Sequence, residues 1–138
     1  MIVVSDKSRA AAEALCELAR RGGHGPVPIQ EVANGRDLPL HFLEQLFGSL
    51  RRAGILQSQR GVKGGYSFAR PPSEVTLLEV VETVDGRLGP APPDPQPSGC
   101  LEPWITARDT LASHLAGITI ADVQELGERV EGAPMFHI

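Results

Sequence analysis

Two basic residues, Arg60 and Lys63, lie inside the glycine-rich segment RGVKGG and carry the clearest chemistry in this chain. The flanking segments 55–59 and 66–68 are typical of two short strands, so we expect the basic residues at the tip of a hairpin. Glycines there permit close approach to another backbone, and two cations favour a polyanion such as nucleic acid. The turn glycines are Gly61, Gly64 and Gly65.

A second group of polar side chains precedes the hairpin. Apolar residues at helical spacing predict a helix from Leu40 to Arg52 with one buried stripe. Pro39 is expected in the first turn of this helix, where no backbone N–H is needed. The face left outside is suited to hydrogen bonding with base edges and phosphates. It consists of His41, Phe42, Gln45, Ser49 and Arg52, and the predicted DNA-binding set adds Pro39 before them and Arg60, Gly61 and Lys63 of the hairpin.

Residues 28–70 as a whole predict two helices joined by a tight turn, followed by a two-stranded hairpin. Pro28 suits the start of the first helix, and Gly54 suits the end of the second. This order is a helix–turn–helix with a β-wing. It is suited to placing one helix in the major groove of DNA, with a basic finger that reaches the adjacent groove or the backbone.

The motifs of this region are similar to those of the Rrf2 family of winged-helix transcription regulators, which includes iron–sulfur cluster regulators, nitric-oxide-sensitive repressors and cysteine-metabolism regulators. The resemblance is carried by PLHFLEQLFGSLRRAGIL, RGVKGGYSFARPP, EVTLLEVVETVDG and GITIADV, so it covers most of the chain. It implies a mainly helical homodimer with a small β-wing and a long dimerisation helix. By position, the family's DNA contacts would fall on the wing tip and on His41, Phe42, Gln45 and Arg60. Phe42 stands where many relatives have tyrosine.

The distribution of charge fits a nucleic-acid partner, although the formal net charge is −4. Residues 1–73 hold ten Lys and Arg against six Asp and Glu, whereas residues 74–138 hold three against eleven. A basic front and an acidic back orient a protein on a polyanion, with an affinity that falls as salt rises. The alternative is that the two halves of the chain differ in charge by chance, without a role in binding.

The chain divides into a winged helix–turn–helix region, residues 1–73, and a region of linker helix, proline-rich loop and dimerisation helices, residues 74–138. We expect the two to form one compact unit, because 138 residues support one modest core. Five prolines between Gly86 and Gly99 predict an extended loop, and the apolar tail Met135–Ile138 has no assigned role. The predicted helices outside residues 28–70 span 8–21, 76–84, 101–116 and 120–130.

Apolar residues in the predicted long helix, 101–116, and just beyond it recur alternately every three and four positions. This is the spacing of a seam against a partner helix. In line with the resemblance, we expect the seam to join two subunits; the alternative is that it packs within its own chain. The seam residues are Trp104, Ala107, Leu111, Leu115 and Ile118.

The cysteines distinguish this chain from family members that bind an iron–sulfur cluster, which carry three cysteines in the loop before the long helix. Only Cys100 lies there, and Cys16 is expected to be a small buried residue of the first helix. Clusters are held mainly by cysteine thiolates, so we expect no iron–sulfur cluster and no other cofactor. The alternative is a strained cluster that bridges two subunits through one Cys100 from each, with His or Glu as the further ligands. No two histidines have metal-ligand spacing on a helix face.

Cys100 is also a candidate redox sensor, because the start of a helix stabilises a thiolate. Alternatively it is a relic of a lost cluster site, without a function. A third route for a signal is an unknown small-molecule effector or protein partner at the proline-rich loop or the acidic rear face.

Other classes of function fit the sequence less well. RGVKGG lacks the ending of a phosphate-binding loop and no catalytic motif is present, so we expect no enzyme. The main competitor is a winged helix that docks a protein without reading DNA, although such a wing has little use for its cations. Without a signal peptide or a long apolar span, the chain is expected to be cytoplasmic. We therefore predict a homodimeric transcription regulator, expected to be a repressor, on a pseudo-palindromic operator in double-stranded DNA.

Overall fold

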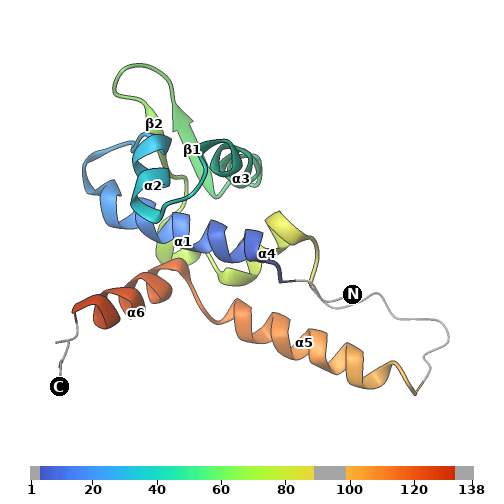
Figure 1. Cartoon of the computed structure of the whole chain (residues 1–138). Helices are drawn as coiled ribbons and strands as arrows, with labels where there is room; N and C mark the ends of the chain where they lie inside the picture. The colour runs from blue at the N-terminus through green and yellow to red at the C-terminus, as the bar shows by residue number, and fades with distance from the viewer. Residues whose placement is uncertain (1–3, 89–98, 133–138) are drawn as a thin grey trace.

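The computed structural model describes residues 4–88 and 99–132 of the chain (Figure 1). The fold is mainly helical with one two-stranded sheet, as predicted. The prolines from Pro90 to Pro97 and the tail Met135–Ile138 lie outside the described residues. The elements are α1 Asp6–Arg21, α2 Ile29–Arg36, α3 Leu40–Arg52, β1 Leu56–Gln59, β2 Gly65–Phe68, α4 Leu77–Asp85, α5 Glu102–Ala116 and α6 Ile120–Gly132, with 3-10 turns at Gly22–His24 and Pro72–Glu74.

Local sequence sets the ends of the helices. The Ser5 side chain accepts the Lys7 amide at 3.1 Å, so α1 begins at Asp6, two residues earlier than predicted. Helix α3 has its predicted bounds, but Pro39 is its N-cap and precedes the first turn. The turn between α2 and α3 passes through Asp37 in a left-handed conformation with φ 53°, which aspartate adopts more readily than most residues.

One apolar core joins the front and the rear of the chain. Helix α1 lies at its centre and packs against α2, α3, α4 and α6 (Figure 1). Phe47 of α3 and Ile120 of α6 are both fully buried in this core. The apolar positions that predicted α3 form its buried stripe, which confirms the helical pattern: Leu43, Leu46, Phe47 and Leu50 are buried, while Leu40 is half-buried at the edge.

Helix α5 is packed less than the others and extends away from the body of the molecule (Figure 1). It packs mainly against α4, where Ala112 forms a small second cluster with Val81 and Leu88. Ala112 is the one buried residue of α5. Within the described ranges, no helix is both long and apolar enough to span a bilayer.

Candidate nucleic-acid interface

Strands β1 and β2 form the predicted wing. They pair antiparallel, with Gln59 opposite Gly65, and the Gly64 N–H donates to the Gly61 carbonyl at 2.9 Å to close the turn. The basic residues therefore stand at the tip, as predicted from the sequence. The exposed residues of the tip are Arg60, Gly61, Val62 and Lys63.

The root of the wing is fixed to the helices. Tyr66 exchanges two backbone hydrogen bonds with Val27, at 2.8 and 2.9 Å, and its ring meets that of Phe47 at an angle of 66°, with centroids 5.1 Å apart. Gly65 permits this approach, because its φ is 153° and a Cβ there would lie 2.3 Å from the Val27 carbonyl. The core that positions α3 therefore also holds the wing.

The outer face of α3 carries a connected row of polar side chains. Gln45 and His41 approach within 3.4 Å through their Nε2 atoms, and the Ser49 hydroxyl donates to the Gln45 carbonyl at 3.2 Å. Arg52 donates to the Ser49 hydroxyl at 3.2 Å. The row places four donor- or acceptor-bearing side chains along one face, on the helix that the sequence assigned to the major groove.

The structure corrects the expected exposure of two residues on this face. Phe42 is half-buried and packs against the core. It lies four residues before Leu46 and therefore at the edge of the apolar stripe. Ser49 is half-buried as well, because its hydroxyl is turned to the helix backbone.

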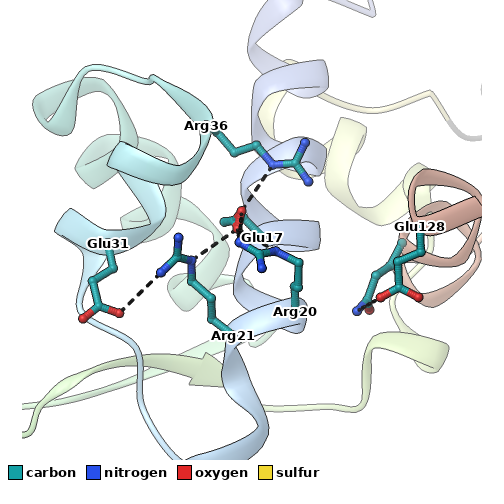
Figure 2. A network of polar contacts seen from close by, with 7 residues as sticks. Glu17, Arg20, Arg21, Glu31, Arg36 and Glu128 are labelled. Carbon is teal, nitrogen blue, oxygen red and sulfur yellow. Dashed lines mark hydrogen bonds and ion pairs between the residues drawn. The ribbon is translucent and has the colours of Figure 1, made fainter. Parts of the chain in front are cut away.

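An ion cluster around the buried carboxylate of Glu17, between α1 and α2, was not predicted from the sequence (Figure 2). Glu17 is 3% exposed and is met by Arg20 (Nη2 to Oε2, 2.6 Å) and Arg21 (Nε to Oε2, 3.2 Å). Arg36, the last residue of α2, reaches the same carboxylate at 3.8 Å. Burial by itself raises the pKa of Glu17, but hydrogen bonds from Arg20 and Arg21 outweigh it and hold the pKa below its usual value.

Part of this cluster has a signal in the sequence. Arg20 and Arg21 follow Glu17 by three and four residues, the spacing of ion pairs on a helix. Nothing in the sequence places Arg36 beside them. Gly35 makes room, since a Cβ there would lie 2.9 Å from the Glu17 Cδ. The cluster thereby fixes the first helix of the helix–turn–helix to α1.

Polar interactions hold helix α4 to other elements at both of its ends. Near its start, Glu79 pairs with Arg70, which follows the wing. At its end, Asp85 accepts the Ser5 amide at 2.8 Å and the hydroxyls of Ser5 and Ser8. Burial by itself raises the pKa of Asp85, but the hydrogen bonds from Ser5 and Ser8 prevail and lower it. Helix α4 thus links the root of the wing, the start of α1 and, through the second cluster, α5.

The predicted seam of α5 is divided between two environments. Trp104 is 71% exposed and Ala107 is exposed too. Leu111 and Leu115 are half-buried and pack in the second cluster against α4. Ile118 lies beyond the end of α5, and its carbonyl accepts the Leu77 amide at 2.8 Å. The C-terminal part of the seam therefore packs in part within its own chain, and its role between two subunits stays a prediction.

The two cysteines of the chain lie in different elements and differ in burial. Cys16 is buried as predicted, its thiol lies 4.0 Å from the Ile120 carbonyl, and burial raises its pKa to about 11. Cys100 is exposed in the turn before α5. In the part of the chain that the structure describes, no three His, Cys, Asp or Glu residues gather as metal ligands.

Comparison with known proteins shows what this arrangement is similar to. The profile of the Rrf2 family, described as an iron-dependent transcriptional regulator, matches residues 4–126. The HTH-type transcriptional regulator CymR of Bacillus subtilis (strain 168) is 32% identical over 137 residues, which cover 98% of this chain and 99% of CymR.

Two solved structures extend the similarity to the fold. The structure of CymR (YrzC), the global cysteine regulator of B. subtilis, superposes with a TM-score of 0.79 and 31% identity, over 91% of this chain and 98% of CymR. The IscR of T. potens gives a TM-score of 0.79 and 29% identity, over 99% of this chain and 94% of IscR.

Proposed function

Because the chain belongs to the Rrf2 family of transcriptional regulators, we propose that it is a repressor that binds a pseudo-palindromic operator as a homodimer. The observation that carries the proposal is that one core positions both of the surfaces expected to contact DNA. The polar row of α3 and the basic wing tip are both held by the core around Phe47. A protein that must place a helix and a hairpin on one duplex needs such a fixed relation.

In the proposed complex, α3 lies in the major groove. His41, Gln45 and Arg52 offer hydrogen bonds to base edges and phosphates, while the edge of Phe42 offers an apolar contact, for instance to a thymine methyl group. Arg60 and Lys63 reach the neighbouring groove or backbone from the wing. The acidic rear, where residues 74–138 carry eleven Asp and Glu, would face away from the DNA.

Dimerisation is proposed to use the open part of α5. Trp104 and Ala107 present apolar surface that the rest of the described chain leaves exposed, and a large exposed tryptophan on a projecting helix is typical of an interface. Two copies joined through α5 would present two α3 helices to successive major grooves, which explains the expected symmetry of the operator.

We also propose that this regulator works without an iron–sulfur cluster. The support is the donor set, since Cys16 is a buried thiol and Cys100 is the one cysteine near the loop before α5. A regulatory signal would then act through Cys100 or through an effector or protein partner that is not yet identified.

One preparation tests these proposals. Protein purified without oxygen is analysed for iron, sulfide and visible absorption, and is then offered a pool of duplexes of random sequence in rounds of selection. We expect a colourless, iron-free dimer that enriches inverted repeats. A brown protein with stoichiometric iron and sulfide would contradict the cluster-free proposal, and failure to enrich any duplex would favour a wing that docks a protein.

A further inference from the structure

The most exposed apolar side chain on the wing is Val62. It is 104% exposed, so no other part of the described chain covers it. It stands between the two cations of the tip, Arg60 and Lys63, which are exposed as well. An isolated apolar residue on a surface needs no explanation by itself, but here it occupies the centre of a basic tip held in a fixed position.

The position of the tip limits what Val62 could touch. Figure 1 shows the wing extending beyond α2 and α3, on the side of α1 opposite to α5 and α6. With α3 in a major groove, the feature that follows across the phosphate backbone is a minor groove. That groove is about 6 Å wide, which excludes a helix but admits a single short side chain.

The floor of the minor groove differs between base pairs in a way that an apolar side chain would detect. A G·C pair presents the N2 amino group of guanine, a hydrogen-bond donor, whereas an A·T pair presents acceptors and the apolar C2–H of adenine. The methyl groups of valine cannot accept a hydrogen bond. They would leave the guanine amino group without water and without a partner, which is costly.

We propose that Val62 is a specificity-determining contact that enters the minor groove between Arg60 and Lys63 and disfavours G·C pairs there. The proposal rests on the proposed function, because it requires α3 and the wing to lie on the same duplex. Lys63 binds a phosphate that lines the groove and supplies affinity on any sequence, and Arg60 lies against the neighbouring backbone or base edge. Val62 adds the discrimination.

The test uses the full-length protein and duplexes enriched from the random pool. Base pairs flanking each half-site are replaced one at a time by A·T, by G·C, or by inosine·cytosine, which lacks the N2 amino group but keeps the major-groove edge of guanine. At the contacted position we expect wild-type protein to bind the A·T and inosine duplexes about tenfold more tightly than the G·C duplex.

Three variants connect this preference to the side chain. Val62→Ser supplies a hydroxyl that accepts a hydrogen bond from the amino group, so the preference should fall to within about twofold. Val62→Ile keeps an apolar tip and should retain the preference. Val130→Ser, at a residue of α6 that is 75% exposed, is the matched control and should behave as wild type.

The outcomes separate this inference from the proposed function. If the wild-type protein enriches operators but Val62→Ser shows the wild-type ratio of affinities, Val62 does not discriminate and only this inference fails. The same holds if the inosine duplex binds as weakly as the G·C duplex. If the wild-type protein enriches no duplex, the proposed function fails and this inference fails with it.

Discussion

The front of the molecule (α1, α2, α3 and the wing) and helix α5 differ in how much of their apolar and charged surface is packed within the chain itself. In the front, α1, α2, α3 and the wing share one core, and even the charged Glu17 has its partners within the chain. Helix α5 has one buried residue, Ala112, and leaves Trp104 exposed. The polar row of α3 and the wing therefore need no second copy to take their shape, whereas α5 leaves apolar side chains uncovered in the single chain.

We infer from this difference that the two regions have separate roles in binding DNA. A rigid front fixes the distance from α3 to the wing within one subunit. The packing of α5 against a second copy would fix the distance between two subunits, which sets the spacing of the half-sites. Variants in the two regions should therefore fail in different ways, and the following four are ordered by the size of the expected effect.

Trp104→Asp should have the largest effect. It places a charge in the proposed interface, and because a central tryptophan is commonly an energetic hot spot, we expect the dimer dissociation constant to rise by roughly 100-fold or more. Sedimentation velocity measures the change. The folded monomer should keep its helical circular dichroism, since the side chain is exposed.

Leu126→Asp, at a residue of α6 that is 55% exposed, is the control for Trp104→Asp and should remain dimeric. The comparison between front and α5 breaks down if Trp104→Asp stays dimeric while Leu126→Asp dissociates, because α6 would then form the interface.

Glu17→Gln tests how much the ion cluster around Glu17 stabilises the front of the molecule. Removing the carboxylate leaves Arg20, Arg21 and Arg36 without their shared anion, so the free energy of unfolding should fall by about 2–3 kcal/mol. Urea denaturation at one fixed protein concentration measures this. Glu13→Gln is the matched control, since its pair with Arg9 is exposed and should contribute less than about 1 kcal/mol.

The same variant predicts a dependence on pH. The pKa of Glu17 is lower in the folded state than its usual value, so its stabilising effect is complete above roughly pH 5 and is lost as the pH falls through the folded-state pKa. The difference in stability between wild type and Glu17→Gln should therefore shrink in acid. A difference that grows in acid would mean that Glu17 is protonated in the native protein.

Arg60→Ala should leave folding and dimerisation intact and act on DNA alone. If Arg60 contacts a base edge, affinity for the selected operator should fall by about 1–3 kcal/mol, as measured by fluorescence anisotropy at a fixed salt concentration. Arg129→Ala, an exposed arginine of α6, is the control. Unchanged affinity in Arg60→Ala would remove the wing from the mechanism.

Lys63→Ala should have the smallest effect and the least selective one. We expect a similar loss of affinity on every duplex, with the slope of log affinity against log salt reduced by about one unit, because one phosphate contact is lost. Titrations at several salt concentrations on the operator and on a scrambled duplex test this. A loss confined to the operator would show that Lys63 reads sequence.

Sequence patterns were sufficient for the elements but not for every contact between them. The stripe from Leu43 to Leu50 and the glycines around Arg60 predicted α3 and the wing, because period and turn chemistry are local properties. The prediction that Phe42 is exposed was wrong, because the burial of a residue at the edge of an apolar stripe depends on which elements pack beside it. Arg36 meets Glu17 across nineteen positions of sequence, and no local pattern encodes that pair.

The division of the α5 seam has the same physical origin. Spacing predicted one continuous apolar edge from Trp104 to Ile118, yet α4 covers the part around Leu111 and Leu115. Periodicity identifies an apolar face but does not say which surface will cover it.

The glycines of the wing also determine where this hairpin can change by mutation. A Cβ at Gly64 would lie 2.2 Å from the Gln59 carbonyl oxygen, and one at Gly65 would strike the Val27 backbone. Side-chain diversity at the tip is therefore confined to its outermost positions, above all to Val62 and Lys63. If Val62 makes the proposed contact, a paralogous copy of such a gene acquires a new operator preference by a single substitution at Val62, without any loss of the scaffold, whereas a substitution at Lys63 changes only the overall affinity.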